Sequence, residues 1–507
     1  MADTKREIER KYESEDSGLP DLTGVAGVAA VLDKGVTHLD ATYYDTADER
    51  LAASSVTLRR RTGGSDAGWH LKFPVAPGVR DEIQAPLSET LPGDLAGLVR
   101  SRVRHGELLP VVRLRSERDV RHLVDADGRL LAEVSVDAVR ADRLTAGGGE
   151  AQWTEIEVEL ADGGDPAFLD KVEKRLRKAG IRPSASASKL ARALAETAPY
   201  KQTAPYEERA SASAGQPETA GDHVLAYVRA QRDAIVELDP AVRRDAEDSV
   251  HSMRVATRRL RSTFKSYGEI LDRTVTDPVG DELKWLAGEL GLDRDREVLT
   301  ERLTAALDEV PATLVRGPVA QRLHTWARTE HGGARGRLIG VLDSRRYLAL
   351  LDTLDALIAD PPLRKAAGKK SRKPIAKAVK KDFRKVAGLV ERAVELEPGT
   401  DRDVAIHEAR KKTKRARYAA EAARPALGKP AKDLVKSMKA LQNLLGEHQD
   451  SVMARQALRE LSAVAHAAGE SAFTYGLLHE REEQRAVRVE TELPGFWDAI
   501  KDGAAGL

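Results

Sequence analysis

The chain has 507 residues, of which 41% are hydrophobic and 32% charged, so it is long enough for two or more globular domains with highly charged surfaces. It has no cysteine, which excludes disulfides, thiolate catalysis and cysteine-ligated zinc. The net charge is only +1 and no apolar stretch approaches membrane-spanning length, so we expect a cytoplasmic protein that does not enter a membrane.

The first 200 residues are predicted to be rich in β-strands. Short alternating runs are separated by Gly, Pro and Asp turn signals, and Asp125 to Gly128 is typical of a hairpin turn. The runs are Val56–Arg61, Trp69–Phe73, Val111–Arg115, Leu130–Val136 and Thr154–Leu160. Helical patterns predict helices at about residues 22–34, 92–104 and 166–179.

A change in composition divides the chain after these strands. Residues 198–218 are rich in Ala, Pro, Ser and charged residues, as linkers are. Long amphipathic patterns of Ala, Leu, Arg and Glu follow and predict helices up to the end of the chain. We therefore expect a β-rich domain at residues 1–197, a linker at 198–218 and an all-helical domain at 219–507.

The helical half contains an internal repeat, which indicates a duplicated structural unit. The run from His251 to Arg261 (HSMRVATRRLR) returns as the run from His407 to Arg417 (HEARKKTKRAR). A Leu-Gly pair follows each copy, with an aspartate four residues after each glycine. These pairs are Gly291 with Asp295 and Gly446 with Asp450. We predict two similar helical bundles, at about residues 219–360 and 375–505.

Charged and apolar side chains alternate along the predicted strands. Glu7, Glu9 and Lys11 share one face, because alternate residues of a strand point the same way. The same spacing pairs Arg59 with Arg61, His70 with Lys72, Arg80 with Glu82, Arg113 with Arg115, and Glu155 with Glu157. A solvated outer face explains any one such strand. Like charges paired on several strands instead indicate a closed barrel that encloses a polyanion and its metal ion.

These residues resemble the CYTH domain, the triphosphate tunnel metalloenzyme domain, over about residues 3–195. The resemblance rests on Glu7-x-Glu9-x-Lys11, the paired arginines, Lys72 after Trp-x-Leu, and the late Glu155-x-Glu157, with Ser188-Lys189 near the end. It implies an α+β fold, an eight-stranded antiparallel tunnel with flanking helices. It also implies hydrolysis of a triphosphate or, less often, cyclisation of ATP, with Mg²⁺ or Mn²⁺ as cofactor.

The resemblance also implies roles for individual residues. The implied metal ligands are Glu7, Glu9, Asp137, Glu155 and Glu157. The implied phosphate-binding residues of the tunnel are Arg59, Arg61, Lys72, Arg80, Arg115, Arg118 and Lys189. Lys11 is expected to act in catalysis together with Glu7 and Glu9, as a charge stabiliser or a water-orienting group beside the scissile phosphate.

Basic residues form a stripe on each copy of the repeated helix, because they are spaced by three or four residues. The stripes are His251, Arg254, Arg258 and Arg261 in the first copy, and His407, Arg410, Lys414 and Arg417 in the second. Like charges at this spacing oppose helix formation by roughly 0.2–0.5 kcal/mol per pair, so two uncompensated stripes indicate a bound polyanion. Each histidine fits either a structural role or a hydrogen bond to phosphate.

The duplicated helix and the two Gly-(x)₃-Asp elements resemble the CHAD domain, the conserved histidine α-helical domain, over about residues 219–505. The resemblance implies two four-helix repeats whose basic central surface binds inorganic polyphosphate. The eight residues of the two stripes are the contacts that it implies. Nothing in this half indicates catalysis.

The sequence as a whole predicts a metal-dependent triphosphatase joined to a polyphosphate-binding module, in the cytoplasm or at polyphosphate granules. A non-catalytic polyphosphate scaffold and an adenylate cyclase are alternatives that the residues leave open. A third alternative is that the helical half binds the phosphate backbone of a nucleic acid. Aromatic residues make up only 4% of the chain and are not interleaved with the basic stripes, which argues against sequence-specific nucleic-acid recognition.

Overall fold

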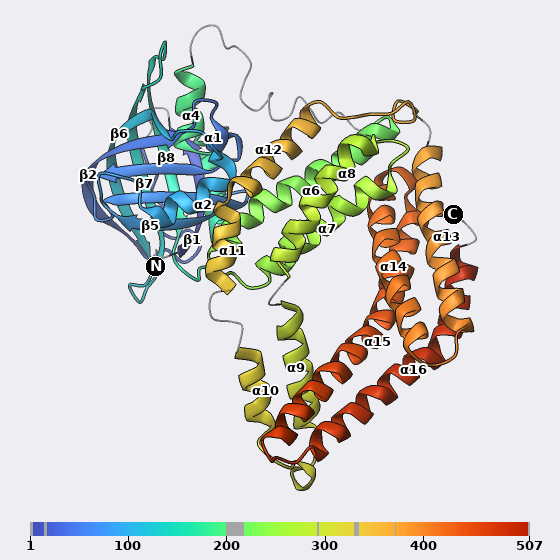
Figure 1. Cartoon of the computed structure of the whole chain (residues 1–507). Coiled ribbons are helices and arrows are strands. Elements are labelled where there is room, and N and C mark those ends of the chain that lie inside the picture. The colour runs from blue at the N-terminus through green and yellow to red at the C-terminus, as the bar shows by residue number, and fades with distance from the viewer. Residues whose placement is uncertain are drawn as a thin grey trace. The chain divides into compact units, whose positions relative to one another are not determined.

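The computed structural model describes residues 4–14, 18–198, 217–291, 294–328, 334–370 and 372–504 (Figure 1). The chain divides into two compact units, Met1–Gly215 and Gln216–Leu507. Most of the linker predicted at residues 198–218 lies outside the described residues.

The first unit is a closed antiparallel β-barrel. Its described strands are β1 (Thr4–Glu13), β2 (Ala30–Asp45), β3 (Thr57–Thr62), β4 (Gly68–Ala76), β5 (Val79–Pro86), β6 (Leu109–Val124), β7 (Leu130–Arg143), β8 (Glu150–Leu160) and β9 (Arg182–Pro183). They follow the order β5-β4-β3-β2-β6-β7-β8-β1, and β5 pairs with β1 to close the ring. The short β9 only adds to β1. The predicted eight-stranded antiparallel tunnel is confirmed.

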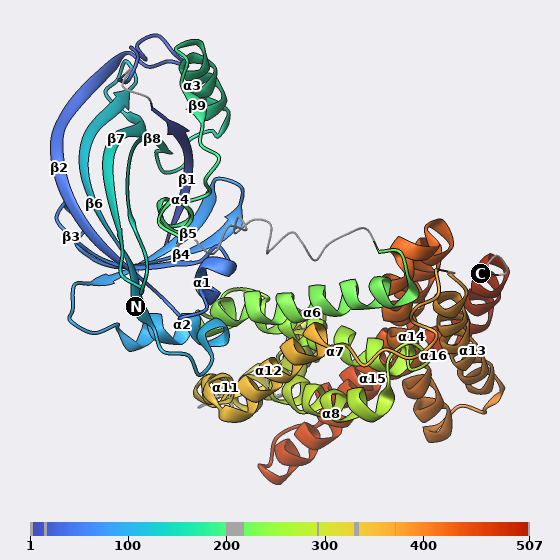
Figure 2. The same ribbon diagram turned by 90° about the horizontal axis from the view of Figure 1, so that it is seen from above.

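Four short helices pack on the barrel (Figure 2): α1 (Arg50–Ala53), α2 (Gly93–Val103), α3 (Ala167–Lys178) and α4 (Lys189–Glu196). Apolar side chains of the strands lie outside the barrel beneath α2 and α3, whereas others, among them Val139 and Trp153, lie inside it against Leu190 of α4. Ile156 and Val158 of β8 share a buried cluster with Leu169 of α3, and Leu71 of β4 shares another with Leu98 of α2. Since alternate residues of a strand point to opposite faces, the charged side chains of these strands turn inward.

Residues 22–34 form no helix, so that prediction is wrong. The backbone takes a left-handed conformation at Gly24, Ala26 and Gly27, with φ of 80°, 54° and 93°, which a right-handed helix does not permit. The chain then enters β2 at Ala30. The helices predicted at residues 92–104 and 166–179 are confirmed as α2 and α3.

The second unit is all-helical (Figure 1). Its described elements are α6 (Ala220–Arg243), α7 (Ser249–Ser266), α8 (Arg273–Glu289), α9 (Arg294–Asp308), the 3₁₀ turn η1 (Ala312–Leu314), α10 (Val319–Arg328), α11 (Ala334–Asp343), α12 (Arg345–Ala359), α13 (Lys373–Glu395), α14 (Thr400–Leu427), α15 (Lys429–Ala467) and α16 (Phe473–Ala504). A capping box starts the first of them, since Thr219 and Asp222 satisfy each other's backbone N–H. None of the described helices combines the length and apolar character needed to cross a bilayer.

The two sequence repeats correspond to two groups of helices that share one core. The first repeat contributes α6, α7, α8 and α12, and the second contributes α13 to α16. The repeated helices α7 and α14 pack together, and the Tyr267 hydroxyl after α7 donates to the Ala419 carbonyl of α14 at 2.6 Å. Helices α9 and α10 leave the first repeat and pack on α15 and α16 through Leu303 and Leu323 (Figure 1).

Candidate functional site

The barrel encloses a polar cavity of about 670 Å³. Charged residues from both ends of the barrel sequence line it: Glu7, Glu9, Lys11, Arg59, Arg61, Lys72, Arg80, Arg118, Glu157 and Lys189. Most of these side chains are at least half-buried, so their charges act on one another with little screening by water. The cavity is therefore suited to charged ligands, and the apolar clusters beneath α2 and α3 lie outside the barrel.

Three carboxylates meet inside the barrel, and one of them, Glu157, lines this cavity. Asp137 of β7 lies directly opposite Glu155 of β8 in the sheet register, and Glu157 follows on the same face. One oxygen from each of the three lies within 4.8 Å of the others. All three side chains are buried.

Lys189 occupies the space between these carboxylates. Ser188 caps α4 by accepting the Ala191 backbone N–H at 3.0 Å, and this start places Lys189 at the barrel. The Lys189 Nζ lies 3.0 Å from Asp137, 2.6 Å from Glu155 and 2.6 Å from Glu157. The Lys189 ammonium thus stands among three oxygen ligands, and a metal ion held by all three would displace it. Such all-carboxylate sets suit hard divalent ions, so the residues fit Mg²⁺ or Mn²⁺.

Arg118 of the neighbouring strand β6 pairs with two of these three carboxylates. Its Nε and Nη2 donate to the two oxygens of Asp137, each at 2.7 Å, and Nη2 also donates to Glu157 at 2.8 Å. Burial alone would raise the pKa of Glu157. The charges of Lys11, Lys189 and Arg118 outweigh burial and hold that pKa well below its usual range. Glu157 is therefore ionised at any physiological pH.

Glu7 and Glu9 lie beside lysines and outside this three-carboxylate group. Glu7 accepts a hydrogen bond from the Lys72 ammonium at 2.5 Å, and Glu9 lies 3.2 Å from the Lys11 ammonium. Burial raises the pKa of Glu7 to about 7, although Lys72 opposes the rise. The structure thus brings three of the five predicted metal ligands together and places the other two along β1.

The predicted phosphate-binding cations of β3 repel one another inside the cavity. Arg61 is 5% exposed and pairs with Asp66, and Arg59 donates to the Tyr43 hydroxyl at 3.2 Å. Burial, followed by the charges of Arg59 and Arg118, lowers the pKa of Arg61 to about 9. A phosphate group bound here would relieve that repulsion.

Arg80 of β5 also reaches the cavity, where its guanidinium donates to the Ala187 carbonyl at 2.7 Å. This contact ties β5 to the segment that precedes α4.

Arg115 faces the outside of the barrel, so its predicted place in the tunnel is wrong. Its guanidinium pairs with Asp142 at 2.6 Å and the side chain is 47% exposed. Arg113, two residues earlier, likewise pairs with Asp40 on the outer face. Arg118 is three residues after Arg115, and an odd separation along a strand reverses the face. The cavity therefore receives Arg118 alone from this group of arginines.

Glu82 and His70 are interior residues that the sequence analysis did not assign to the site. The Glu82 carboxylate lies 2.9 Å from the His70 Nδ1 and 3.5 Å from the Lys72 ammonium. Glu82 also accepts from the Gln84 amide at 2.7 Å. The sequence could have placed Glu82 in the interior, because it lies two residues after Arg80 and therefore on the same inward face of β5.

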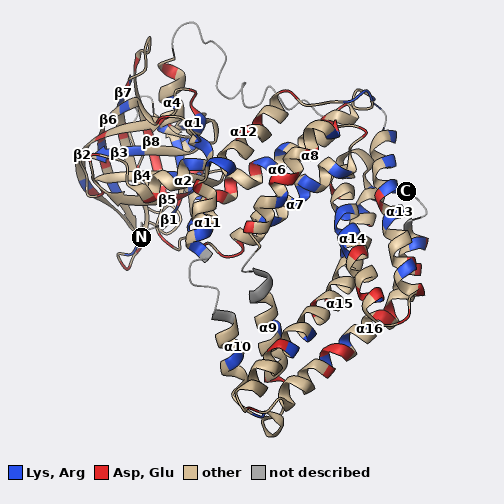
Figure 3. Ribbon diagram, viewed as in Figure 1, with Lys and Arg blue, Asp and Glu red and all other residues tan. Residues whose placement is uncertain are grey.

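In the helical unit, Lys and Arg gather on α7, α13 and α14 (Figure 3). Arg254 and Arg258 of α7 lie close enough to Lys414 of α14 to repel it, as does Arg410 on the same helix. Burial, followed by Arg258 and Arg410, lowers the pKa of Lys414 to about 7. The predicted stripes of the two repeats therefore converge at these four residues.

The other four predicted contacts have different surroundings. His251 is exposed, and the His407 Nδ1 lies 2.5 Å from the Gln449 side-chain oxygen. Arg417 lies 3.4 Å from Glu421 and stacks over the Tyr418 ring at 4.7 Å, while the Arg261 Nε is buried.

The repeated glycines lie against the repeated arginines. A Cβ added to Gly291 would come 2.6 Å from the Arg254 Cζ, whereas a Cβ on Gly446 would meet the Arg410 Nε at an ordinary 3.6 Å. Gly291 is not in a left-handed conformation, so this glycine provides room rather than backbone freedom. Asp450 pairs with Arg410 at 3.8 Å, and the Asp295 side chain lies outside the described residues.

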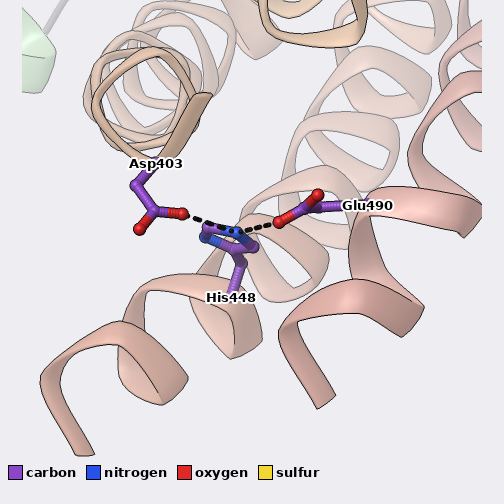
Figure 4. A group of neighbouring side chains, drawn as sticks. All are labelled: Asp403, His448 and Glu490. Carbon is purple, nitrogen blue, oxygen red and sulfur yellow. Dashed lines mark hydrogen bonds and ion pairs between the residues drawn. The ribbon is translucent and has the colours of Figure 1, made fainter. Parts of the chain in front are cut away.

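A second group, centred on the buried His448, joins three helices of the second repeat (Figure 4). The His448 Nε2 lies 3.4 Å from Asp403 and 3.1 Å from Glu490. Arg402 pairs with Glu490 at 2.8 Å and Arg455 lies 3.5 Å from Asp403. Together these contacts form an ion-pair network that ties α14, α15 and α16 together.

Comparisons with known proteins match one domain family to each of the two compact units of the chain. A CYTH domain model matches residues 5–194 and a CHAD domain model matches residues 226–459. Two uncharacterized proteins of Mycobacterium tuberculosis, Rv2226 of strain H37Rv and MT2285 of strain CDC 1551, are each 38% identical over 503 residues. These alignments cover 96% of this chain and 94% of each relative.

Two solved structures are similar to parts of the chain. PptA from Streptomyces chartreusis is 21% identical with a TM-score of 0.47, over 55% of this chain and 99% of that one. The CHAD domain from the plant Ricinus communis is 24% identical with a TM-score of 0.44, over 58% of this chain and 95% of that one.

Proposed function

The chain belongs to the family of proteins that join a CYTH domain to a CHAD domain, and on this premise we propose that it is a metal-dependent triphosphatase that also binds polyphosphate. The barrel hydrolyses an inorganic triphosphate, and the helical domain binds inorganic polyphosphate. The observation that carries the first part is the barrel interior, where buried guanidinium and ammonium groups face a buried three-carboxylate group.

Different residues of the barrel have different roles in the hydrolysis of a phosphoanhydride. Asp137, Glu155 and Glu157 would hold a divalent ion, which supplies charge neutralisation at the transferred phosphoryl group. Arginines such as Arg59 and Arg118 offer paired N–H donors to non-bridging phosphate oxygens. Lys189 and Lys11 add positive charge beside the same carboxylates, where charge develops on the leaving phosphate.

The cavity lining favours an inorganic substrate over a nucleotide. Among the described lining residues, Tyr43 is the only Phe, Tyr or Trp, and its hydroxyl accepts a hydrogen bond from Arg59. An adenine ring would find no second Phe, Tyr or Trp ring to stack on among these described lining residues. This supports hydrolysis of tripolyphosphate rather than cyclisation of ATP.

Phosphate release by the full-length protein tests this proposal. Tripolyphosphate, thiamine triphosphate and ATP are each supplied with Mg²⁺ or Mn²⁺, and phosphate and cyclic AMP are both measured. We expect tripolyphosphate to turn over fastest and EDTA to stop the reaction. Cyclic AMP as the main product would support the cyclase instead, and no product from any substrate would leave a non-catalytic polyphosphate-binding protein.

The proposal for the helical domain is supported by the convergence of Arg254, Arg258, Arg410 and Lys414. Clustered cations of this kind weaken a fold unless an anion joins them. A linear polyphosphate chain carries a negative charge on every phosphate and matches a cluster drawn from two helices. A protein that joins such a surface to a triphosphatase raises the effective concentration of polymer near its own catalytic domain.

Replacing Gly291 by Ala is expected to weaken polyphosphate binding about tenfold, the cost of misplacing one charge-assisted contact. The new Cβ displaces the Arg254 guanidinium, which lies at the flexible end of its side chain, so the fold and the melting temperature are retained. Affinity for long-chain polyphosphate, measured by titration calorimetry, reports the loss.

Gly446→Ala is the matched control, because its Cβ makes only ordinary contact with Arg410. It should bind polyphosphate like the wild type, while Arg254→Ala should match Gly291→Ala. Tripolyphosphate turnover should be unchanged in all three variants. Equal losses for the two glycine variants would contradict the assigned role of Gly291.

A further inference from the structure

We propose that Asp403, His448 and Glu490 form a zinc-binding site that joins helices α14, α15 and α16 of the second repeat. The site uses none of the residues of the barrel interior or of the basic stripes, so the inference goes beyond the function proposed above.

Three side chains from three helices bring their ligand atoms together (Figure 4). Asp403 lies in the first turn of α14, the fully buried His448 lies on α15, and Glu490 lies on α16. One nitrogen or oxygen atom from each lies within 4.8 Å of the other two. One imidazole nitrogen and two carboxylate oxygens are a ligand set that Zn²⁺ accepts, with a water molecule as the fourth ligand. The Asp403 side chain is 25% exposed, so solvent can supply that water.

The distances between the ligand atoms fit a tetrahedral ion. The His448 Nε2 lies 3.1 Å from the Glu490 Oε1 and 3.4 Å from the Asp403 Oδ1. Zinc bonds of about 2.0–2.1 Å at tetrahedral angles place neighbouring ligand atoms about 3.3–3.4 Å apart. Zinc can therefore enter with small movements of these side chains.

Two arginines hold the carboxylates in the orientation that ligation requires. The Glu490 Oε2 pairs with Arg402 at 2.8 Å, while the Oε1 of the same carboxylate faces His448. The Asp403 Oδ2 lies 3.5 Å from Arg455, while its Oδ1 faces His448. Each carboxylate thus gives one oxygen to an arginine and presents the other to the histidine. Outer partners of this kind orient the ligands of metal sites in general.

The His448 ring is able to bind an ion through Nε2. Its Nδ1 has no hydrogen-bond partner among the described residues, so no contact there fixes the tautomer. The ring proton can therefore reside on Nδ1 when a metal takes Nε2.

The site is specific to the second repeat. Two residues after the repeated glycine, the second repeat has His448 and the first repeat has Asp293. His448 is also distinct from the two repeated histidines, His251 and His407.

A zinc ion bound here would connect three helices and stabilise the folded state, because the unfolded chain does not hold the three ligands together. We expect zinc to raise the melting temperature of the EDTA-treated full-length protein. The rise should be lost in His448→Gln.

Titration calorimetry of EDTA-treated, full-length protein with Zn²⁺ tests the inference. Glu155→Gln is the parent protein, because it weakens the competing carboxylate group of the barrel. Adding His448→Gln to this parent should lower the affinity for zinc by at least about 100-fold, more than the loss of an outer partner usually costs. Glu490→Gln is a second variant with the same expected loss, and circular dichroism reports whether each variant is folded.

His466→Gln is the control, because His466 is an exposed histidine of the same helix. It should bind zinc as the parent does. Anomalous diffraction at the zinc absorption edge locates the ion, and we expect its peak between Asp403, His448 and Glu490.

Zinc affinity that is unchanged in His448→Gln and Glu490→Gln, or an anomalous peak elsewhere, would overturn the inference. So would an absence of zinc binding by the parent, which would leave His448 as a hydrogen-bond bridge between two carboxylates. Each of these outcomes leaves the proposed triphosphatase and polyphosphate binding untouched.

Discussion

Replacing Glu155 by Gln is expected to lower the rate of metal-dependent tripolyphosphate hydrolysis by about 100-fold or more, the effect of losing several kcal/mol of charge stabilisation. Gln has nearly the same shape and can still accept the Trp153 indole N–H, which Glu155 accepts at 2.7 Å. It carries no charge, however, so the group with Asp137 and Glu157 loses one anionic ligand. Initial rates over a range of Mg²⁺ concentrations should show a lower maximum and a higher half-saturating concentration of metal.

Glu150→Gln is the control for this experiment, because Glu150 is an exposed residue on the outer face of the same strand. It should leave both the rate and the dependence on Mg²⁺ unchanged. Wild-type metal dependence in Glu155→Gln would show that the three-carboxylate group does not hold the ion.

Arg118→Gln is expected to lower kcat/KM for tripolyphosphate by about 10- to 100-fold, the value of a charge-assisted hydrogen bond to phosphate. The fold should survive, because Lys189 still lies 3.0 Å from the buried Asp137 after Arg118 is lost. A phosphate-binding role predicts a rise in KM as well as a fall in kcat. Steady-state kinetics over a wide range of substrate concentration separate the two.

Arg115→Gln is the matched control three residues away, on the outer face of β6. Its pair with Asp142 is exposed, and such surface pairs contribute only about 0–1 kcal/mol, so we expect activity within about twofold of the wild type. Comparable losses in the two variants would mean that substrate does not enter the barrel.

The barrel and its charged interior could be predicted from the sequence because a strand has a period of two residues. In β8 the alternation of Glu155 and Glu157 with Ile156 and Val158 leaves two choices, and only one of them buries the apolar side chains. The apolar set packs beneath α3, so the acids face inward. Strict alternation along β6 would likewise have placed Arg115 and Arg118 on opposite faces, because they are three residues apart.

Other features could not be predicted, because they depend on contacts between segments far apart in the sequence. The pairing of Lys189 with Asp137 joins α4 to β7, and no local pattern indicates it. The packing of α9 and α10 on the second repeat is of the same kind. The role of Gly291 became apparent only when the Arg254 guanidinium was found against it.

A crystal structure with Mn²⁺ and a non-hydrolysable imido analogue of tripolyphosphate tests the central claim most directly. We predict anomalous density for manganese within about 2.0–2.6 Å of oxygens from Asp137, Glu155 and Glu157, as for hard cations bound by carboxylates. The phosphate chain should lie inside the barrel, within hydrogen-bond distance of Arg59 and Arg118. Manganese bound elsewhere, or an analogue bound only outside the barrel, would contradict the account.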